Sequence, residues 1–254
     1  MSYISLGLNT LISAVKKAGN TLTRDFNEIE QLQTSVRGHL EFSKAAEERV
    51  SKILRAELQK HHPDYTFADN KNKLPKGNFF VINALDGKLN FMHGIPYFSV
   101  SAAIVENNQV IAAVIYNPAT SDLYFAEKGR GAFKEGYRNH ERLRVSGRKD
   151  LKNALIGVKN CDSAIEVAGL RNNGALSLDM AMLASGKLDG LFSQDNRLSE
   201  YAAGLLLVKE AGGYTYEYNQ QDIRTDNQSA VLESGNIIAG NAELAPKLYK
   251  ALHI

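Results

Sequence analysis

The chain opens with two stretches in which apolar residues recur every three or four positions. Between residues 8 and 26 this spacing puts the apolar side chains on one face of a helix. The spacing returns between residues 42 and 58, where charged residues take the opposite face, and it stops near His62, before Pro63. The pattern predicts two amphipathic helices.

The pattern then changes to short apolar runs that are typical of strands. A polar loop over 69–77 precedes the first run, and short turns such as 106–109 and 117–122 separate the later ones. Short connections suit antiparallel neighbours, whereas parallel strands need long crossovers. We therefore expect the two helices to pack against an antiparallel sheet with strands at 79–82, 99–105, 110–116, 123–126 and 132–134.

Beyond a charged, irregular segment at 136–150, strands and helices alternate. This order favours an α/β second half, and glycines at 186, 212 and 213 mark helix ends. We interpret residues 1–254 as one domain, with helices and an antiparallel sheet in 1–140 and the α/β half in 141–254. The expected strands are 154–158, 188–192, 214–218 and 236–239, and the expected helices are 176–184, 200–211 and one from 242.

Composition narrows the class of protein. With 44% hydrophobic and 23% charged residues, the chain is typical of a globular protein. A net charge of +2 with scattered basic residues makes nucleic acid an improbable ligand. The single Cys161 cannot form an intrachain disulfide, and the sequence shows neither a leader peptide nor an apolar run of membrane-spanning length. These features favour a cytoplasmic protein without a membrane segment.

Several motifs resemble one family, in the right order along the chain. They are LDGKLNF at 85–91, GIPYFSVS at 94–101, KGRGAF at 128–133, LDMAMLASGKLDG at 178–190 and EYAAGLLLVKEAGG at 200–213. Together they resemble the inositol monophosphatase family, in its bacterial inositol-1-monophosphatase and extragenic suppressor form. The resemblance implies a layered αβαβα fold, usually a homodimer, and hydrolysis of small phosphate monoesters. In that family acidic residues hold Mg²⁺, whose charge activates water and neutralises the leaving oxygen.

The metal-binding motifs depart from the family pattern. The first-motif glutamate is replaced by Asn70, although a shift of one position would bring Asp69 into play. The second motif keeps Asp86 but has Asn83 in place of its other acid. In the third motif the acid is Glu200. Carried over position by position, the candidate metal ligands are Asp86, Glu200, the Leu85 carbonyl, Asn83 and Asn70.

Lys88 stands where the family has a water-orienting threonine. With only Asp86 and Glu200 as acids, a lysine beside them leaves the site near neutral, so we expect Mg²⁺ binding to be weak or absent. Lys88 either supplies a permanent cation, which holds a phosphate or pairs with the two acids, or points into solvent. Asp86 and Lys88 are the catalytic candidates. Glu200 has a second interpretation, as an acid that stabilises a helix N-terminus.

The positions that bind phosphate and substrate in the family are partly kept in this chain. Gly174 and Ala175 match the small pair whose backbone amides meet phosphate at a helix N-terminus. Ser193 stands where inositol-specific members carry a glutamate, which argues against inositol specificity. The candidate phosphate- or substrate-binding positions are therefore Gly87, Lys88, Gly174, Ala175 and Ser193.

Three functions remain open on the sequence. The first is a family member that keeps the fold, a homodimer and binding of a small phosphorylated molecule, but has lost most or all phosphatase activity. The second is an active Mg²⁺-dependent phosphomonoesterase that uses one ion. The third is a non-catalytic protein of the extragenic suppressor type, which acts through its surface.

Overall fold

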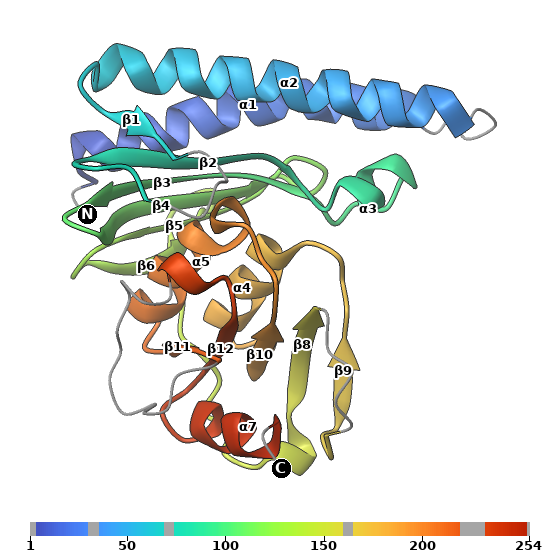
Figure 1. Ribbon diagram of the computed structural model, residues 1–254, viewed down its shortest axis with the longest axis vertical. Helices are drawn as coiled ribbons and strands as arrows, with labels where there is room; N and C mark the ends of the chain where they lie inside the picture. The colour runs from blue at the N-terminus through green and yellow to red at the C-terminus, as the bar shows by residue number, and fades with distance from the viewer. Residues whose placement is uncertain (1–3, 30–35, 69–73, 160–164, 219–231, 253–254) are drawn as a thin grey trace.

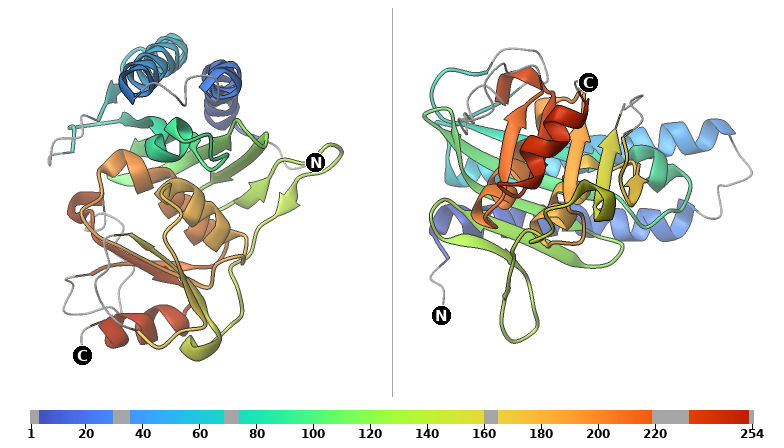
Figure 2. Two further views of the ribbon diagram at one scale, coloured as in Figure 1. Left: turned by 90° about the vertical axis from the view of Figure 1, so that its right-hand side faces the viewer. Right: turned by 90° about the horizontal axis from the view of Figure 1, so that it is seen from below.

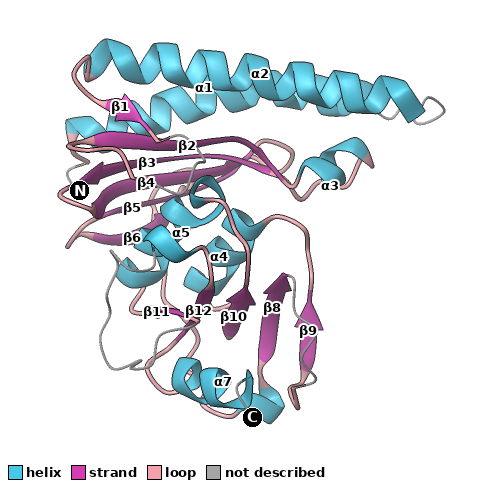
Figure 3. Ribbon diagram, in the orientation of Figure 1, coloured by secondary structure: helices cyan, strands magenta, loops and turns pink. Residues whose placement is uncertain are grey.

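The chain folds into five stacked layers of helices and sheets (Figure 1; Figure 3). The computed structural model describes residues 4–29, 36–68, 74–159, 165–218 and 232–252. Two long helices, α1 (Leu6–Ile29) and α2 (Val36–His61), cover one face of a seven-stranded sheet. Its other face packs on α4 (Leu176–Ala184) and α5 (Leu198–Glu210), which lie between it and a five-stranded sheet. Helix α7 (Leu244–Leu252) forms the last layer, as the end-on view in Figure 2 shows.

The first sheet has its strands in chain order and is antiparallel apart from the β1–β2 pair, which is parallel. This confirms the antiparallel pattern expected from short turns. Strands β1 and β7 were not predicted, because two residues carry no hydrophobic period. The strands are β1 (Thr66–Phe67), β2 (Phe79–Asp86), β3 (Ser99–Glu106), β4 (Gln109–Asn117), β5 (Asp122–Glu127), β6 (Gly131–Lys134) and β7 (Glu141–Arg142).

The second sheet is mixed, in the order β11-β12-β10-β8-β9. Strands β8, β9 and β10 run parallel, whereas β12 is antiparallel to both of its neighbours. Alternating helices and strands were correctly expected here, but alternation alone does not fix strand direction. The strands are β8 (Leu155–Lys159), β9 (Gly169–Arg171), β10 (Gly190–Ser193), β11 (Tyr214–Glu217) and β12 (Ile237–Gly240), and a 3₁₀ turn, η2 (Leu151–Asn153), precedes β8.

Three apolar cores hold the layers together. One lies between α1, α2 and the first sheet, one surrounds α4 and α5, and one lies under α7. Helices α4 and α5 approach closely at Gly204, whose missing side chain permits the contact. A Cβ added there would lie 2.6 Å from the Met180 Cβ. Among the described residues, no helix is both long and apolar enough to cross a bilayer.

Candidate functional site

A β-bulge near the end of β2 aims Asp86 at the middle layer. Asn83 pairs with Ser101 and Asp86 with Ser99, so β2 has one residue more than β3 between these pairs. The extra residue puts Ala84 and Leu85 both into the core beneath α1 and α2. Asp86 is thereby turned back to the α4 side of the sheet. Bulges beside functional sites often redirect a side chain in this way.

The Asp86 carboxylate caps the N-terminus of α4. Its Oδ2 accepts hydrogen bonds from the Ser177 amide, at 2.8 Å, and from the Ser177 hydroxyl, while Oδ1 accepts from the Gly87 amide at 3.1 Å. The residue at the start of α4, Ala175, has no side chain that could do this. Burial raises the pKa of Asp86 to about 6. An internal carboxylate therefore already uses the amide of Gly87, one of the predicted phosphate-binding positions, and the Ser177 amide at the N-terminus of α4.

Gly87 brings the DGKLNF segment against the start of α4. Its φ of 73° lies in the left-handed region, and an added Cβ would lie 2.7 Å from the Tyr97 carbonyl oxygen and 3.0 Å from the Ala175 Cβ. Asn90 donates to the carbonyls of Tyr97 and Asn173, at 2.8 and 2.7 Å. The predicted positions Gly87, Gly174 and Ala175 do therefore come together in space.

Lys88 takes a different direction from the one predicted. The segment after Gly87 forms a short helix, α3 (Lys88–Met92), which the sequence analysis did not predict. As its first residue, Lys88 reaches α2, and its Nζ lies 2.7 Å from Glu47 Oε2. Of the alternatives left open for Lys88, the structure does not show the pairing with Asp86 and Glu200, because α3 carries the ammonium to Glu47 of α2. Whether Lys88 holds a phosphate stays a prediction.

A lysine that the sequence analysis missed binds Glu200 instead. Lys159 is the last residue of β8, and its Nζ lies 3.0 Å from Glu200 Oε2. Residue Arg197 donates its backbone N–H to Oε2 at 2.9 Å and its guanidinium to Oε1 at 3.3 Å. Burial raises the pKa of Glu200, but these donors outweigh it and leave the pKa lowered. Glu200 therefore closes the first turn of α5 and neutralises Lys159.

A signal for Lys159 was present in the strand pattern. Lys159 pairs with Ser193 in the parallel β8–β10 ladder, so both residues stand at the carboxyl end of their strands. Ligand sites in open α/β sheets gather at that edge. Ser193 itself is fully buried and donates to Asn196 Oδ1 at 2.8 Å, which occupies its hydroxyl.

The other predicted metal ligands are Leu85, Asn70 and the alternative Asp69. The side chain of Leu85 is buried in the core beneath α1 and α2, and the role of its carbonyl as a ligand stays a prediction. Asn70 and Asp69 lie outside the described residues, so both predictions for the first motif remain untested.

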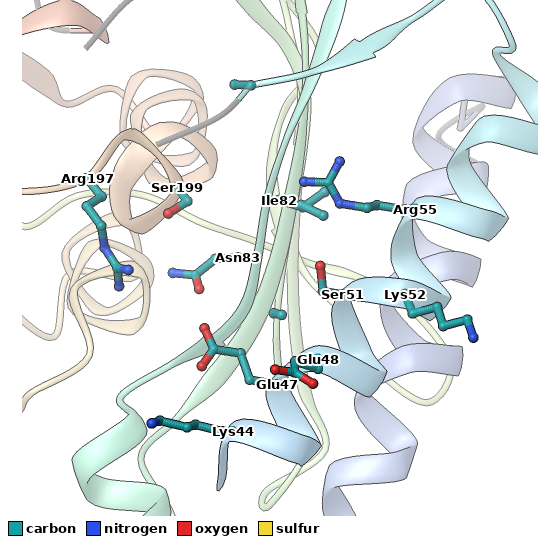
Figure 4. A pocket seen from close by; sticks show the side chains of 12 residues that line it. Lys44, Glu47, Glu48, Ser51, Lys52, Arg55, Ile82, Asn83, Arg197 and Ser199 are labelled. Carbon is teal, nitrogen blue, oxygen red and sulfur yellow. The ribbon is translucent and has the colours of Figure 1, made fainter. Parts of the chain in front are cut away.

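A charged pocket of about 640 Å³ lies between α2 and the start of α5 (Figure 4). Asn83 lies in it, points toward Arg197 and Ser199, and is only 6% exposed. Within the described part of the chain, the Asn83 Nδ2 has no hydrogen-bond partner. Basic residues outnumber acidic ones in the pocket wall, whose lining is Lys44, Glu47, Glu48, Ser51, Lys52, Arg55, Ala68, Ile82, Asn83, Ala84, Arg197 and Ser199.

Among the residues that the structure describes, the donor set does not fit a cluster of Mg²⁺ ions. Among the described residues, no three side chains of His, Cys, Asp or Glu come together in a way that could hold a metal. Asp86 is committed to α4, and Glu200 is committed to Lys159 and Arg197. A divalent ion needs several oxygen ligands and excess negative charge, whereas here a lysine and an arginine offset the two acids.

The comparisons with known proteins agree with this fold. The model of the inositol monophosphatase family matches residues 5–254. The chain is 37% identical to an inositol-1-monophosphatase of Rhizobium meliloti, over 96% of this chain and 95% of that protein. It is 31% identical to the Nus factor SuhB of Xylella fastidiosa, over 96% and 94%. The crystal structure of the extragenic suppressor protein SuhB from Bartonella henselae superposes with a TM-score of 0.81, at 31% identity, over 99% of this chain and all of that one. The chain belongs to the inositol monophosphatase family, whose reaction is the hydrolysis of phosphate monoesters.

Proposed function

We propose that this protein binds a small phosphorylated molecule and has lost most or all of the Mg²⁺-dependent hydrolysis of its family. One observation carries the proposal: the Glu200 carboxylate, which stands at the third-motif acid position, is already bonded to Lys159 and Arg197. A carboxylate neutralised by two cations has little charge left to attract a metal ion. Asn83, which points toward Arg197, stands where the family carries a further acid.

The pocket supports anion binding. Asn83 places a buried amide donor beside the Arg197 guanidinium, and a buried donor without a partner is costly unless a ligand accepts its hydrogen bond. Arginine binds phosphate oxygens in a planar, two-pronged geometry. A phosphate group between these two side chains would satisfy both.

Turnover measurements test the loss of hydrolysis. Purified protein with millimolar Mg²⁺ should release little or no phosphate from inositol monophosphates or from general monoester substrates. An inositol monophosphatase of the same family, assayed in parallel, is the positive control. Turnover at ordinary family rates that Asp86→Asn abolishes would overturn the proposal in favour of an active one-ion enzyme.

Calorimetry tests the binding half of the proposal. An inositol monophosphate should bind without Mg²⁺, and Arg197→Ala should weaken it about tenfold, since charge-assisted hydrogen bonds contribute roughly 1.5–3 kcal/mol. Arg148→Ala is a matched control: Arg148 is 55% exposed against 56% for Arg197, and it pairs with a different acid, Asp189. Equal affinity in both variants would contradict a phosphate site at Arg197.

A second candidate function follows from the named relatives. Several of them are Nus factors called SuhB, including the protein from Escherichia coli at 29% identity over 96% of this chain. A non-catalytic interaction protein would be consistent with a chain that keeps the family fold while its metal-binding residues are replaced. Affinity capture from the source cell that recovers no transcription or ribosomal component would count against this candidate.

A further inference from the structure

The end of β8 places an ammonium group against Glu200, one of the two acids that the site retains. Lys159 Nζ contacts Glu200 directly at 3.0 Å. Its charge also acts on Asp86, whose pKa it lowers while the Glu200 charge raises it. Lys159 and Glu200 are thus in direct contact, and the charges of both act on the Asp86 carboxyl, although the three residues are far apart in the sequence.

The position of Lys159 is fixed by the fold rather than by a flexible surface contact. The β8–β10 ladder sets where β8 ends, because Gly190 to Ser193 pair in register with Ile156 to Lys159. The Glu200 side chain is only 12% exposed and that of Lys159 32%. A partly buried ion pair of this kind is screened less than a surface pair.

We propose that the Lys159 ammonium is a built-in cation that replaces a metal ion beside Asp86 and Glu200 and presents, with Arg197, the positive charge for a phosphate group. This inference rests on the proposed function and deepens it. It transfers to Lys159 the role that the sequence suggested for Lys88, whose ammonium pairs with Glu47. The phosphate ligand would meet permanent side-chain cations, so its binding would not require Mg²⁺.

The inference makes a specific statement about metal affinity. A unit charge about 4 Å from a divalent ion, with water-like screening, weakens binding of that ion roughly thirtyfold. Removing the ammonium should therefore raise affinity for a divalent ion. The effect is easiest to detect when a further acid is present, which Asn83→Asp would supply where the family carries one.

Binding of Mn²⁺, followed by electron paramagnetic resonance and calorimetry, tests this. Asn83→Asp/Lys159→Met should bind Mn²⁺ at least about tenfold more tightly than Asn83→Asp alone. Lys159→Gln in place of Lys159→Met keeps a long polar side chain, and should give the same direction if the methionine variant folds poorly. Equal Mn²⁺ affinity with and without Lys159 in folded protein would overturn the inference.

Two lysines serve as controls. Lys88 has the same exposed fraction as Lys159, 32%, so Asn83→Asp/Lys88→Met separates the two hypotheses. Only the Lys159 variant should gain metal affinity, and a larger gain on removing Lys88 would contradict the assignment. Lys16→Met removes a lysine of similar exposure, 37%, which pairs with Glu135 outside the site, and should change nothing.

A binding measurement without metal completes the test. Lys159→Met should weaken binding of an inositol monophosphate several-fold in the presence of a chelator, and unchanged binding would overturn the phosphate role of Lys159. The proposed function fails separately, if the wild-type protein itself binds Mg²⁺ tightly and turns over substrate. The two failures are therefore distinguishable.

Discussion

At the scale of single residues, the unusual groups are two buried carboxyls at the start of α4. Asp86 is bonded to Ser177, and Asp179 accepts from the Tyr97 hydroxyl at 2.7 Å and from Asn173 at 2.6 Å. Burial is the main cause that raises the pKa of each to about 6. Both acids are therefore costly to ionise in the folded protein.

This cost should appear in the pH dependence of stability. An acid whose folded pKa is raised takes up protons more readily when folded, so its contribution to the free energy of unfolding falls as pH rises from about 4 to 6. Asp86→Asn keeps an acceptor for the Ser177 amide and removes the charge. Over that interval the free energy of unfolding should fall by about 2 kcal/mol less in the variant than in wild type.

Denaturant unfolding at several pH values between 4 and 7 measures this difference. Acids with lowered pKa, such as Glu57, act in the opposite direction as pH falls. Because the variant retains them, they cancel in the comparison. Parallel curves for wild type and Asp86→Asn would show that the pKa of Asp86 does not differ between the folded and the unfolded protein, which would contradict the raised pKa.

At the scale of elements, the sequence predicted those whose pattern is long enough to show a period. The first helix was expected over residues 8–26 and runs from Leu6 to Ile29. Helix α3 was missed because five residues cannot show a helical period, and because helices that short depend on tertiary contacts. Here those contacts come from Gly87 and Asn90, and the missed helix explains the unexpected partner of Lys88.

Gly87→Ala tests how strongly this junction depends on close packing. Two costs add: a positive φ, which disfavours alanine by about 1 kcal/mol, and the clash with Tyr97 and Ala175. We expect a loss of roughly 2–4 kcal/mol in the free energy of unfolding. Gly77→Ala is the control, because Gly77 has a φ of 80° but no atom within 4 Å of an added Cβ.

The difference between the two glycine variants isolates the close contacts of Gly87 with Tyr97 and Ala175. Thermal and denaturant unfolding of both proteins provide the measurement. If Gly77→Ala and Gly87→Ala cost the same, the close approach of Gly87 to Tyr97 and Ala175 contributes nothing beyond backbone conformation.

At the scale of the whole molecule, the site is assembled from separate layers. Asp86 comes from the first sheet, Lys159 from the second, Glu200 from the helix layer between them, and Glu47 from the outer helices. Sequence motifs identify residues that lie together within one segment, such as Asp86 and Gly87. They did not identify Lys159, because its position depends on parallel pairing between strands more than thirty residues apart. The homodimer remains a prediction.

The charge of the assembled site should decide which ligands stabilise the whole fold. A ligand that binds only the folded state adds about 1.4 kcal/mol to the free energy of unfolding at tenfold excess over its dissociation constant. For a domain of this size that corresponds to a rise of roughly 3–5 °C in Tm.

An inositol monophosphate should produce such a rise in a chelator-containing buffer, whereas millimolar Mg²⁺ alone should leave Tm unchanged. Arg197→Ala should reduce the response to phosphate, because it removes one of the cations that the ligand meets. If Mg²⁺ alone raised Tm, or phosphate acted only in its presence, the acids of the site would hold a metal despite Lys159, and the fold would have kept the ionic requirement of its family.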